Sequence, residues 1–247
     1  MKKSTSYIVA GIAAGVVLAL VSFLLGRSTV AVPETPVAAA TAADGPVLHV
    51  AVGGADKVWG WGPGGAVYQR TGDEWQRRTG IVTDVSVGSD GTVWKINDTG
   101  APHIWNGKAW AKRRGNLRGI SVGDKKHVWG VNHQSRPVRW NGKKFDGQPG
   151  RLLRISAASD GTVWGINRGR WPVRLDKNKW KKVGKKRLLE IAVASKSEVW
   201  GIDEQNRIVK LQNGTFEVMM DKPAVVSLDA APDGTVWYVA AAPSLLP

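Results

Sequence analysis

The 247-residue sequence contains no cysteine, and it has only three tyrosines and three phenylalanines. The absence of cysteine excludes a disulfide framework, thiolate nucleophiles and every zinc site built on sulfur. Acidic residues are also scarce, because 20 Asp and Glu oppose 35 Lys and Arg and leave a formal net charge of +15. This imbalance predicts attraction to polyanions. By contrast, the chain has 13 tryptophans, which indicates repeated use of one aromatic side chain.

One long hydrophobic run stands near the N-terminus. Residues 7–26 carry no charge, and as a helix rising about 1.5 Å per residue they would span roughly 30 Å, the thickness of a bilayer core. A secretory signal peptide has a shorter apolar region, about 7 to 15 residues long, with a small-residue cleavage site close behind it. The nearest such site here, residues 38–40, lies well beyond Arg27. We therefore expect residues 1–27 to form a short cytoplasmic tail and a transmembrane signal anchor, with a cleaved signal and secretion as the alternative.

The segment after this run has a different composition. Residues 28–46 are rich in Ala, Pro and Thr and lack an apolar period, which predicts a flexible stalk. The folded domain is then expected over residues 47–247. Because two lysines precede the hydrophobic run, the positive-inside tendency places this domain outside the cytoplasm, in the periplasm or at the cell surface.

A repeat runs through the whole expected domain. A Val-Trp pair recurs at intervals of 35 to 37 residues, with its tryptophans at Trp59, Trp94, Trp129, Trp164, Trp200 and Trp237. A second aromatic follows 16 residues after each of the first five, at Trp75, Trp110, Phe145, Trp180 and Phe216. The period is that of one supersecondary unit repeated in space, and we expect these tryptophans to pack between neighbouring units.

Each unit shows the signals of four short strands. Alternating apolar residues mark the first two strands, as in residues 83–88 and 92–97. Asp-Gly dipeptides join these two strands, and Asn-Gly dipeptides join the third to the fourth, as tight hairpins require. Four antiparallel strands repeated radially predict an all-β, six-bladed β-propeller. The last unit, residues 224–242, has only two strands, so this blade is either left short or completed by a strand from residues 28–46.

The repeat also carries a family resemblance. Residues 117–132 read LRGISVGDKKHVWGVN, and RWNG follows at residues 139–142. This pattern resembles the tectonin-type propeller repeat over about 200 residues. The first unit lacks the third-strand tryptophan, and the fifth and sixth are irregular. The resemblance implies a binding module, because the family includes secreted lectins for lipopolysaccharide or modified sugars and intracellular proteins with membrane-related roles.

Basic residues concentrate on one side of the predicted propeller. In a four-stranded blade, the loop between the second and third strands lies on the same face as the connection to the next blade. Both kinds of connection are rich in Arg and Lys. Arginine suits phosphate or carboxylate groups because its guanidinium binds them in a bidentate manner; a solvated basic surface without a partner is the alternative. The predicted ligand-binding residues are Arg113, Arg114, Arg136, Arg168, Arg170, Trp171 and Lys186.

Two features of these connections have alternative interpretations. Trp171 stands where other units carry Arg136 or Arg207, so it is expected to be exposed, either as a platform for a sugar ring or packed against a neighbour. A polar residue ends the second strand of four units, at Asn97, Asn132, Asn167 and Asp203. These side chains either bind sugar hydroxyls or close turns by bonding to their own backbone.

The sequence therefore predicts a membrane-anchored, lectin-like module that recognises anionic glycans or lipopolysaccharide through its basic loops. The alternative is a propeller scaffold that recruits an acidic protein in an envelope assembly. Nucleic acid is a poor candidate, because most aromatics are expected in the core and the domain lies outside the cytoplasm. The four histidines lack metal-binding spacing, so we expect no metal, no cofactor and no enzymatic activity.

Overall fold

The structure is a computed structural model that describes residues 47–221 and 224–241. The expected anchor, residues 1–27, and the expected stalk, residues 28–46, lie outside the described residues. Within the described part of the chain, no helix is long and apolar enough to cross a membrane.

The described residues form five four-stranded antiparallel sheets and one two-stranded sheet. The first sheet contains β1 (His49–Gly54), β2 (Lys57–Trp61), β3 (Ala66–Thr71) and β4 (Glu74–Ile81), with a short 3₁₀ turn, η1 (Pro63–Gly65), between β2 and β3. The second contains β5 (Asp84–Val87), β6 (Val93–Ile96), β7 (Pro102–Trp105) and β8 (Trp110–Lys112). The third contains β9 (Leu117–Val122), β10 (Val128–Asn132), β11 (Pro137–Trp140) and β12 (Phe145–Gly147). The fourth contains β13 (Leu152–Ala157), β14 (Val163–Asn167), β15 (Pro172–Asp176) and β16 (Lys179–Lys182). The fifth contains β17 (Leu188–Val193), β18 (Val199–Asp203), β19 (Ile208–Gln212) and β20 (Thr215–Met220), and the last contains β21 (Val225–Ala230) and β22 (Val236–Ala240).

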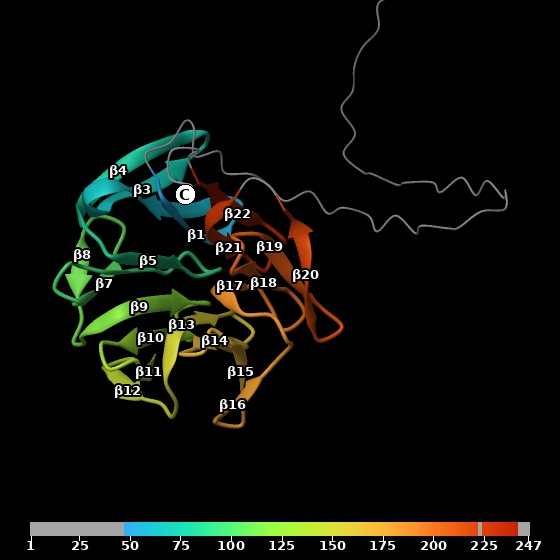
Figure 1. Cartoon of the computed structure of the whole chain (residues 1–247). Coiled ribbons are helices and arrows are strands. Elements are labelled where there is room, and N and C mark those ends of the chain that lie inside the picture. Colours follow the sequence, from blue (N-terminus) through green and yellow to red (C-terminus); the bar gives the residue numbers. More distant parts are fainter. Residues whose placement is uncertain (1–46, 222–223, 242–247) are drawn as a thin grey trace, which may run out of the picture. The chain divides into compact units, whose positions relative to one another are not determined.

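These sheets are the blades of a β-propeller. The first strand of each sheet is innermost and contacts the first strands of the blades on both sides, so that β21 returns to β1 and closes a ring (Figure 1). Over the described residues the fold has five complete blades and a partial sixth, which confirms the expected propeller of four-stranded antiparallel blades. Completion of that blade by residues 28–46 falls outside the described residues.

The hairpin turns explain why each unit folds as a blade. Gly91 follows β5 with φ of 83°, and Gly142 joins β11 to β12 with φ of 95°. Both values lie in the left-handed region, which glycine adopts without steric cost. The Asp-Gly and Asn-Gly dipeptides thus place a glycine at turn positions with positive φ, which favours these tight hairpins.

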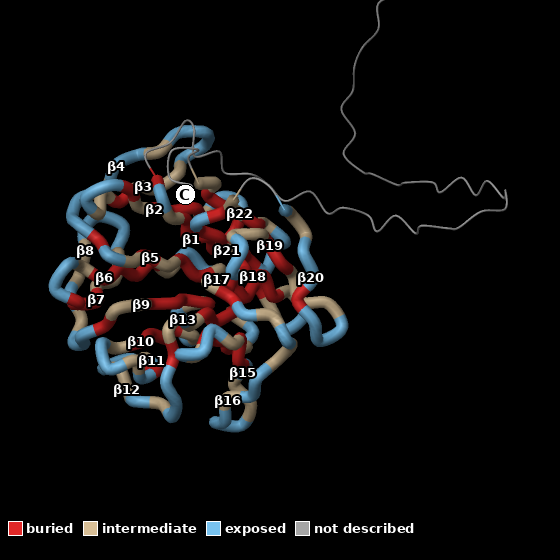
Figure 2. Tube along the Cα trace, viewed as in Figure 1, coloured by how far each residue is buried: buried red, intermediate tan, exposed pale blue. Residues whose placement is uncertain are grey.

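The repeated tryptophans fill the boundaries between blades. Trp94 on β6 is only 1% exposed, and its ring packs edge-on against Trp140 and Phe145 of the next blade. Trp59 makes the same contact with Trp105 and Trp110. Figure 2 shows the consequence, with buried residues concentrated in the inner strands and exposed residues along the outer strands and loops. The expected packing role of these in-register tryptophans is confirmed.

Candidate functional site

The connections that carry the predicted site lie on one face of the ring. The connection into each new blade runs beside a loop of the preceding blade, as the hydrogen bond from Leu117 N to Gly100 O shows. Equivalent bonds join Leu152 N to Ser135 O and Leu188 N to Arg170 O. We call the surface formed by these paired connections the loop face.

The predicted ligand-binding residues are distributed over three blade boundaries of the loop face. Arg113 and Arg114 lie between β8 and β9, Arg136 lies between β10 and β11, Arg168, Arg170 and Trp171 lie between β14 and β15, and Lys186 lies between β16 and β17. The structure gathers Arg170, Trp171 and Lys186 near the boundary of the fourth and fifth blades. Arg113 and Arg114 belong to a different boundary, so the seven residues do not form a single cluster.

These cations differ in whether they have a partner. Arg170 pairs with Glu204 at 3.3 Å, and Lys186 lies 3.6 Å from Asp203, whose side chain is fully buried. Arg114, Arg136 and Arg168 are exposed, and no carboxylate of the described residues lies within ion-pair distance of them. The loop face therefore presents unpaired guanidinium groups from three successive blades.

Trp171 is half-buried rather than fully exposed. The Nζ of Lys182 lies 3.3 Å from the centre of its ring, and the guanidinium carbon of Arg187 lies at 5.1 Å. Both are cation–π contacts with neighbouring strands and loops. A sugar that stacked on the face covered by Lys182 would first have to displace that side chain.

The recurring polar residues after the second strands close turns. Oδ1 of Asn167 accepts hydrogen bonds from the main-chain N–H groups of Gly169 and Trp171, at 2.9 and 3.1 Å. Asn132 holds the N–H of Arg136 in the same way, at 2.9 Å. The turn-closing interpretation is therefore confirmed, and these bonds fix the loops that carry the arginines.

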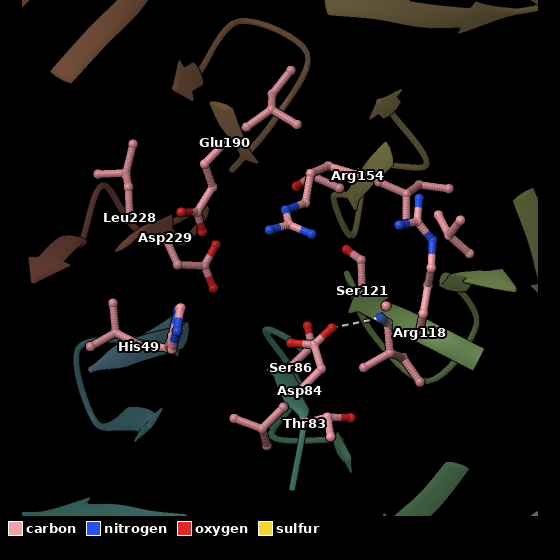
Figure 3. A pocket seen from close by; sticks show the side chains of 18 of the residues that line it. His49, Thr83, Asp84, Ser86, Arg118, Ser121, Arg154, Glu190, Leu228 and Asp229 are labelled. Carbon is pink, nitrogen blue, oxygen red and sulfur yellow. Dashed lines mark hydrogen bonds between the residues drawn. The ribbon is translucent and has the colours of Figure 1, made fainter. Parts of the chain in front are cut away.

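A cavity opens among the inner strands where they leave the loop face. Its volume is about 330 Å³, and residues where the inner strands begin, such as Asp84 at the start of β5 and Thr83 just before it, line it (Figure 3). Every blade contributes one charged or titratable side chain to the wall: His49, Asp84, Arg118, Arg154, Glu190 and Asp229.

Main-chain hydrogen bonds hold two carboxylates of this wall in place. Oδ2 of Asp84 accepts from Ile120 N at 2.8 Å, and Oδ2 of Asp229 accepts from Val52 N at 2.8 Å. Each of these bonds crosses from one blade to the next, so the carboxylates also join the inner strands.

The two arginines of the wall behave differently. Arg118 donates to the carbonyl oxygens of Leu152 and Leu153, at 2.8 and 3.1 Å, and is thereby fixed to the next blade. Burial, followed by the positive charges of Arg154 and Arg168, lowers the pKa of the Arg118 guanidinium. Arg168 belongs to the loop face, so the positive charge of that face acts on an arginine of the cavity.

Burial controls the protonation of the carboxyl groups. It raises the pKa of Glu190 to about 8 and the pKa values of Asp84 and Asp229 to about 7. The positive charge of Arg154 opposes this rise in pKa at Glu190 and Asp84. The negative charge of Asp84 adds to the rise in pKa at Glu190 and Asp229. Burial also lowers the pKa of His49. The cavity thus contains acids that titrate near neutral pH.

The sequence prediction did not single out this wall as a site. A signal was present, because polar residues alternate along the inner strands, as in Asp84 and Ser86 or Arg154 and Ser156. Residues two apart on a strand share a face, so this alternation marks the side that faces the axis. It does not by itself show which residues oppose one another across the ring.

Comparison with known proteins finds one matching family in the sequence and similar folds among solved structures. The profile of the tectonin domain matches residues 46–168 and 151–245. No curated protein matches the chain.

Among solved structures, the one described as YCF48 bound to D1 peptide has a TM-score of 0.52 at 18% identity, covering 72% of this chain and 69% of that one. U3-55K has a TM-score of 0.56 at 10% identity, with coverage of 75% and 72%. The extracellular domain of a hybrid two-component system from B. thetaiotaomicron has a TM-score of 0.54 at 9% identity, and the match covers 78% of this chain but 30% of that one. At these identities the likeness concerns the fold.

Proposed function

The chain belongs to the tectonin family of β-propeller repeat proteins, and from this we propose that it is a lectin-like binding module for anionic glycans or lipopolysaccharide-like surfaces. The ligand binds to the loop face. The proposal assigns no catalytic step and no cofactor to the chain.

The unpaired arginines of the loop face carry this proposal. Arg114, Arg136 and Arg168 come from successive blades and have no ion-pair partner among the described residues. Guanidinium groups bind phosphate and carboxylate in a bidentate manner. Because the blades repeat around the ring, a repetitive anionic surface can engage several of these groups at once, and weak contacts then add up to useful affinity.

Membrane attachment is part of the proposal and depends on sequence alone. Residues 1–27 are proposed to anchor the chain, with the propeller displayed outside the cytoplasm. Attachment would hold many copies at one surface, which favours multivalent contact with a repetitive glycan.

The test is binding of the full-length chain, kept in detergent, to an array of neutral and anionic glycans and lipopolysaccharides. The measurement is made at low and at physiological salt, because exposed charge contacts weaken as salt screens them. Selective binding of particular anionic glycans that persists at physiological salt supports the proposal. Equal binding of every polyanion that disappears with salt, or no binding, contradicts it and favours the scaffold that recruits an acidic protein.

A further inference from the structure

The central cavity separates basic from acidic side chains. Arg118 and Arg154 stand on the neighbouring strands β9 and β13, whereas Glu190 and Asp229 stand on the neighbouring strands β17 and β21. Around the ring, β21 is followed by β1, which carries His49, and then by β5, which carries a third acidic residue, Asp84. One side of the wall is therefore cationic and the other acidic, within about 330 Å³.

The basic and acidic side chains of the cavity face each other without forming an ion pair. Figure 3 shows the guanidinium of Arg154 directed into the cavity, towards the carboxyl groups of Glu190 and Asp229. No ion pair of 4.0 Å or less joins Arg154 to a carboxylate of the described residues. Elsewhere in the chain a guanidinium and a carboxylate meet directly, as Arg207 and Asp203 do at 2.7 Å. The space between the two sides is near the lower end of the range for small-molecule sites, which begins at about 300 Å³.

The acidic side is not arranged as a metal site. Among residues 47–221 and 224–241, no three His, Asp or Glu side chains are placed to hold one metal ion. Asp84 and Asp229 each use one carboxylate oxygen to accept a main-chain N–H from the next blade. This geometry suits an organic cation, whose several N–H donors can reach carboxyl groups that lie apart.

We propose that the cavity binds a zwitterionic group that carries an ammonium and an oxyanion, such as phosphate or carboxylate. The ammonium lies against Glu190 and Asp229, and the oxyanion lies against Arg154, with Arg118 behind it. Neither half of such a ligand is satisfied alone, because a lone anion leaves the acidic side without a cation and a lone cation meets the guanidinium groups. This site is separate from the glycan contacts of the loop face.

The protonation of the acidic side fits this ligand. Glu190 has a pKa raised to about 8, chiefly by burial, and an ammonium placed beside it would favour its ionised form. At pH 7 the binding of the zwitterion therefore releases protons. Calorimetry in buffers of different ionisation enthalpy measures this release directly.

The experiment titrates phosphoethanolamine into the full-length chain in detergent, with inorganic phosphate and ethanolamine as single-charge probes. Binding is followed by calorimetry and by the indole N–H signal of Trp61, which lines the cavity and stacks on His49 at 4.3 Å. We expect phosphoethanolamine to bind at least about tenfold more tightly than either single-charge probe.

Variants then locate the binding site. Glu190→Gln and Arg154→Gln should each weaken phosphoethanolamine binding by about tenfold or more. Arg114→Gln removes a guanidinium of the loop face and should leave this affinity unchanged. Thermal unfolding of each variant verifies that the propeller is intact. Since Glu190→Gln keeps the shape of the side chain, it remains informative if Arg154→Gln fails to fold.

Three results would overturn the proposal. One is the absence of binding at millimolar phosphoethanolamine, and another is equal binding of inorganic phosphate. The third is a loss in Arg114→Gln as large as the loss in Arg154→Gln, which would place the ligand on the loop face. None of these results affects glycan binding on the array, so failure here and failure of the lectin proposal are distinguishable.

Discussion

Asp160 joins two blades, because its Oδ2 accepts a hydrogen bond of 2.8 Å from the main-chain N–H of Lys196. Its other oxygen, Oδ1, accepts the N–H of Thr162 at 2.8 Å and closes its own hairpin. Asp90 bonds to Lys125 N of the next blade in the same way, at 3.0 Å. Each Asp-Gly turn thus has a second role, since it holds the neighbouring blade as well as its own strands.

We predict that Asp160→Ala lowers the free energy of unfolding by about 1–3 kcal/mol, because the variant leaves two main-chain donors without this acceptor. Urea unfolding of the two proteins measures the difference. Asp73→Ala is the matched control, since Asp73 is fully exposed and pairs only with Arg70 at the surface; its effect should stay below about 0.5 kcal/mol. Equal effects of the two substitutions would show that the contact between blades adds nothing.

The tryptophans divide into two classes with different expected effects. Trp94 is 1% exposed, and Trp94→Ala should lower the free energy of unfolding by about 3–5 kcal/mol, because it opens a void at a blade boundary. Trp171 is half-buried beneath Lys182, and Trp171→Ala should cost about 1 kcal/mol or less. Denaturant unfolding of both variants checks the contrast. A large loss in Trp171→Ala would mean that its cation–π contacts support the fourth blade.

The fold could be predicted because its determinants are local and repeated. The spacing of Trp59, Trp94 and Trp129 gives the length of a blade, and turn dipeptides such as Asp90-Gly91 give the hairpins. These signals act within a few residues and recur in register. The structure then differs from the expected strands by little, as β5 begins at Asp84 within the predicted segment 83–88.

The candidate sites were harder to predict because they depend on which blades meet. Arg170 appeared in the sequence as an available cation, yet Glu204 of the next blade pairs with it at 3.3 Å. Contacts within one blade were also missed, because Lys182 of β16 covers Trp171, which lies 11 positions earlier in the chain beside β15. The cavity is the extreme case, because Arg154 and Asp229 face each other only once the ring has closed.

The cavity carboxyl groups should make the propeller less stable as pH rises from about 5 to 9. The pKa of Glu190 is raised from 4.5 to about 8, and those of Asp84 and Asp229 are raised from 3.8 to about 7. Over this range the folded state holds more protons than the unfolded state, so the free energy of unfolding falls with pH. The lowered pKa of His49 acts in the opposite direction near 6.5, but one imidazole opposes three carboxyl groups.

Thermal unfolding between pH 5 and 9 measures this dependence, and Glu190→Gln should reduce its slope because the amide does not titrate. Glu74→Gln is the control, since Glu74 at the start of β4 is exposed and forms no ion pair with the described residues. A melting temperature that rises across this range would contradict the assignment, as would an unchanged slope in Glu190→Gln.

Unpaired cations on the loop face should contribute more to polyanion binding than cations elsewhere. Charge reversal of two of the three unpaired arginines, Arg136→Glu with Arg168→Glu, should lower the affinity for an anionic polysaccharide by about tenfold at low salt. It should also reduce the salt dependence, because fewer charges are screened. The matched control, Lys108→Glu with Lys143→Glu, makes the same change in net charge at the Asn-Gly turns of β7–β8 and β11–β12, on the opposite face. If both pairs weaken binding equally, net charge rather than the loop face controls it, and the arginines are a solvated surface.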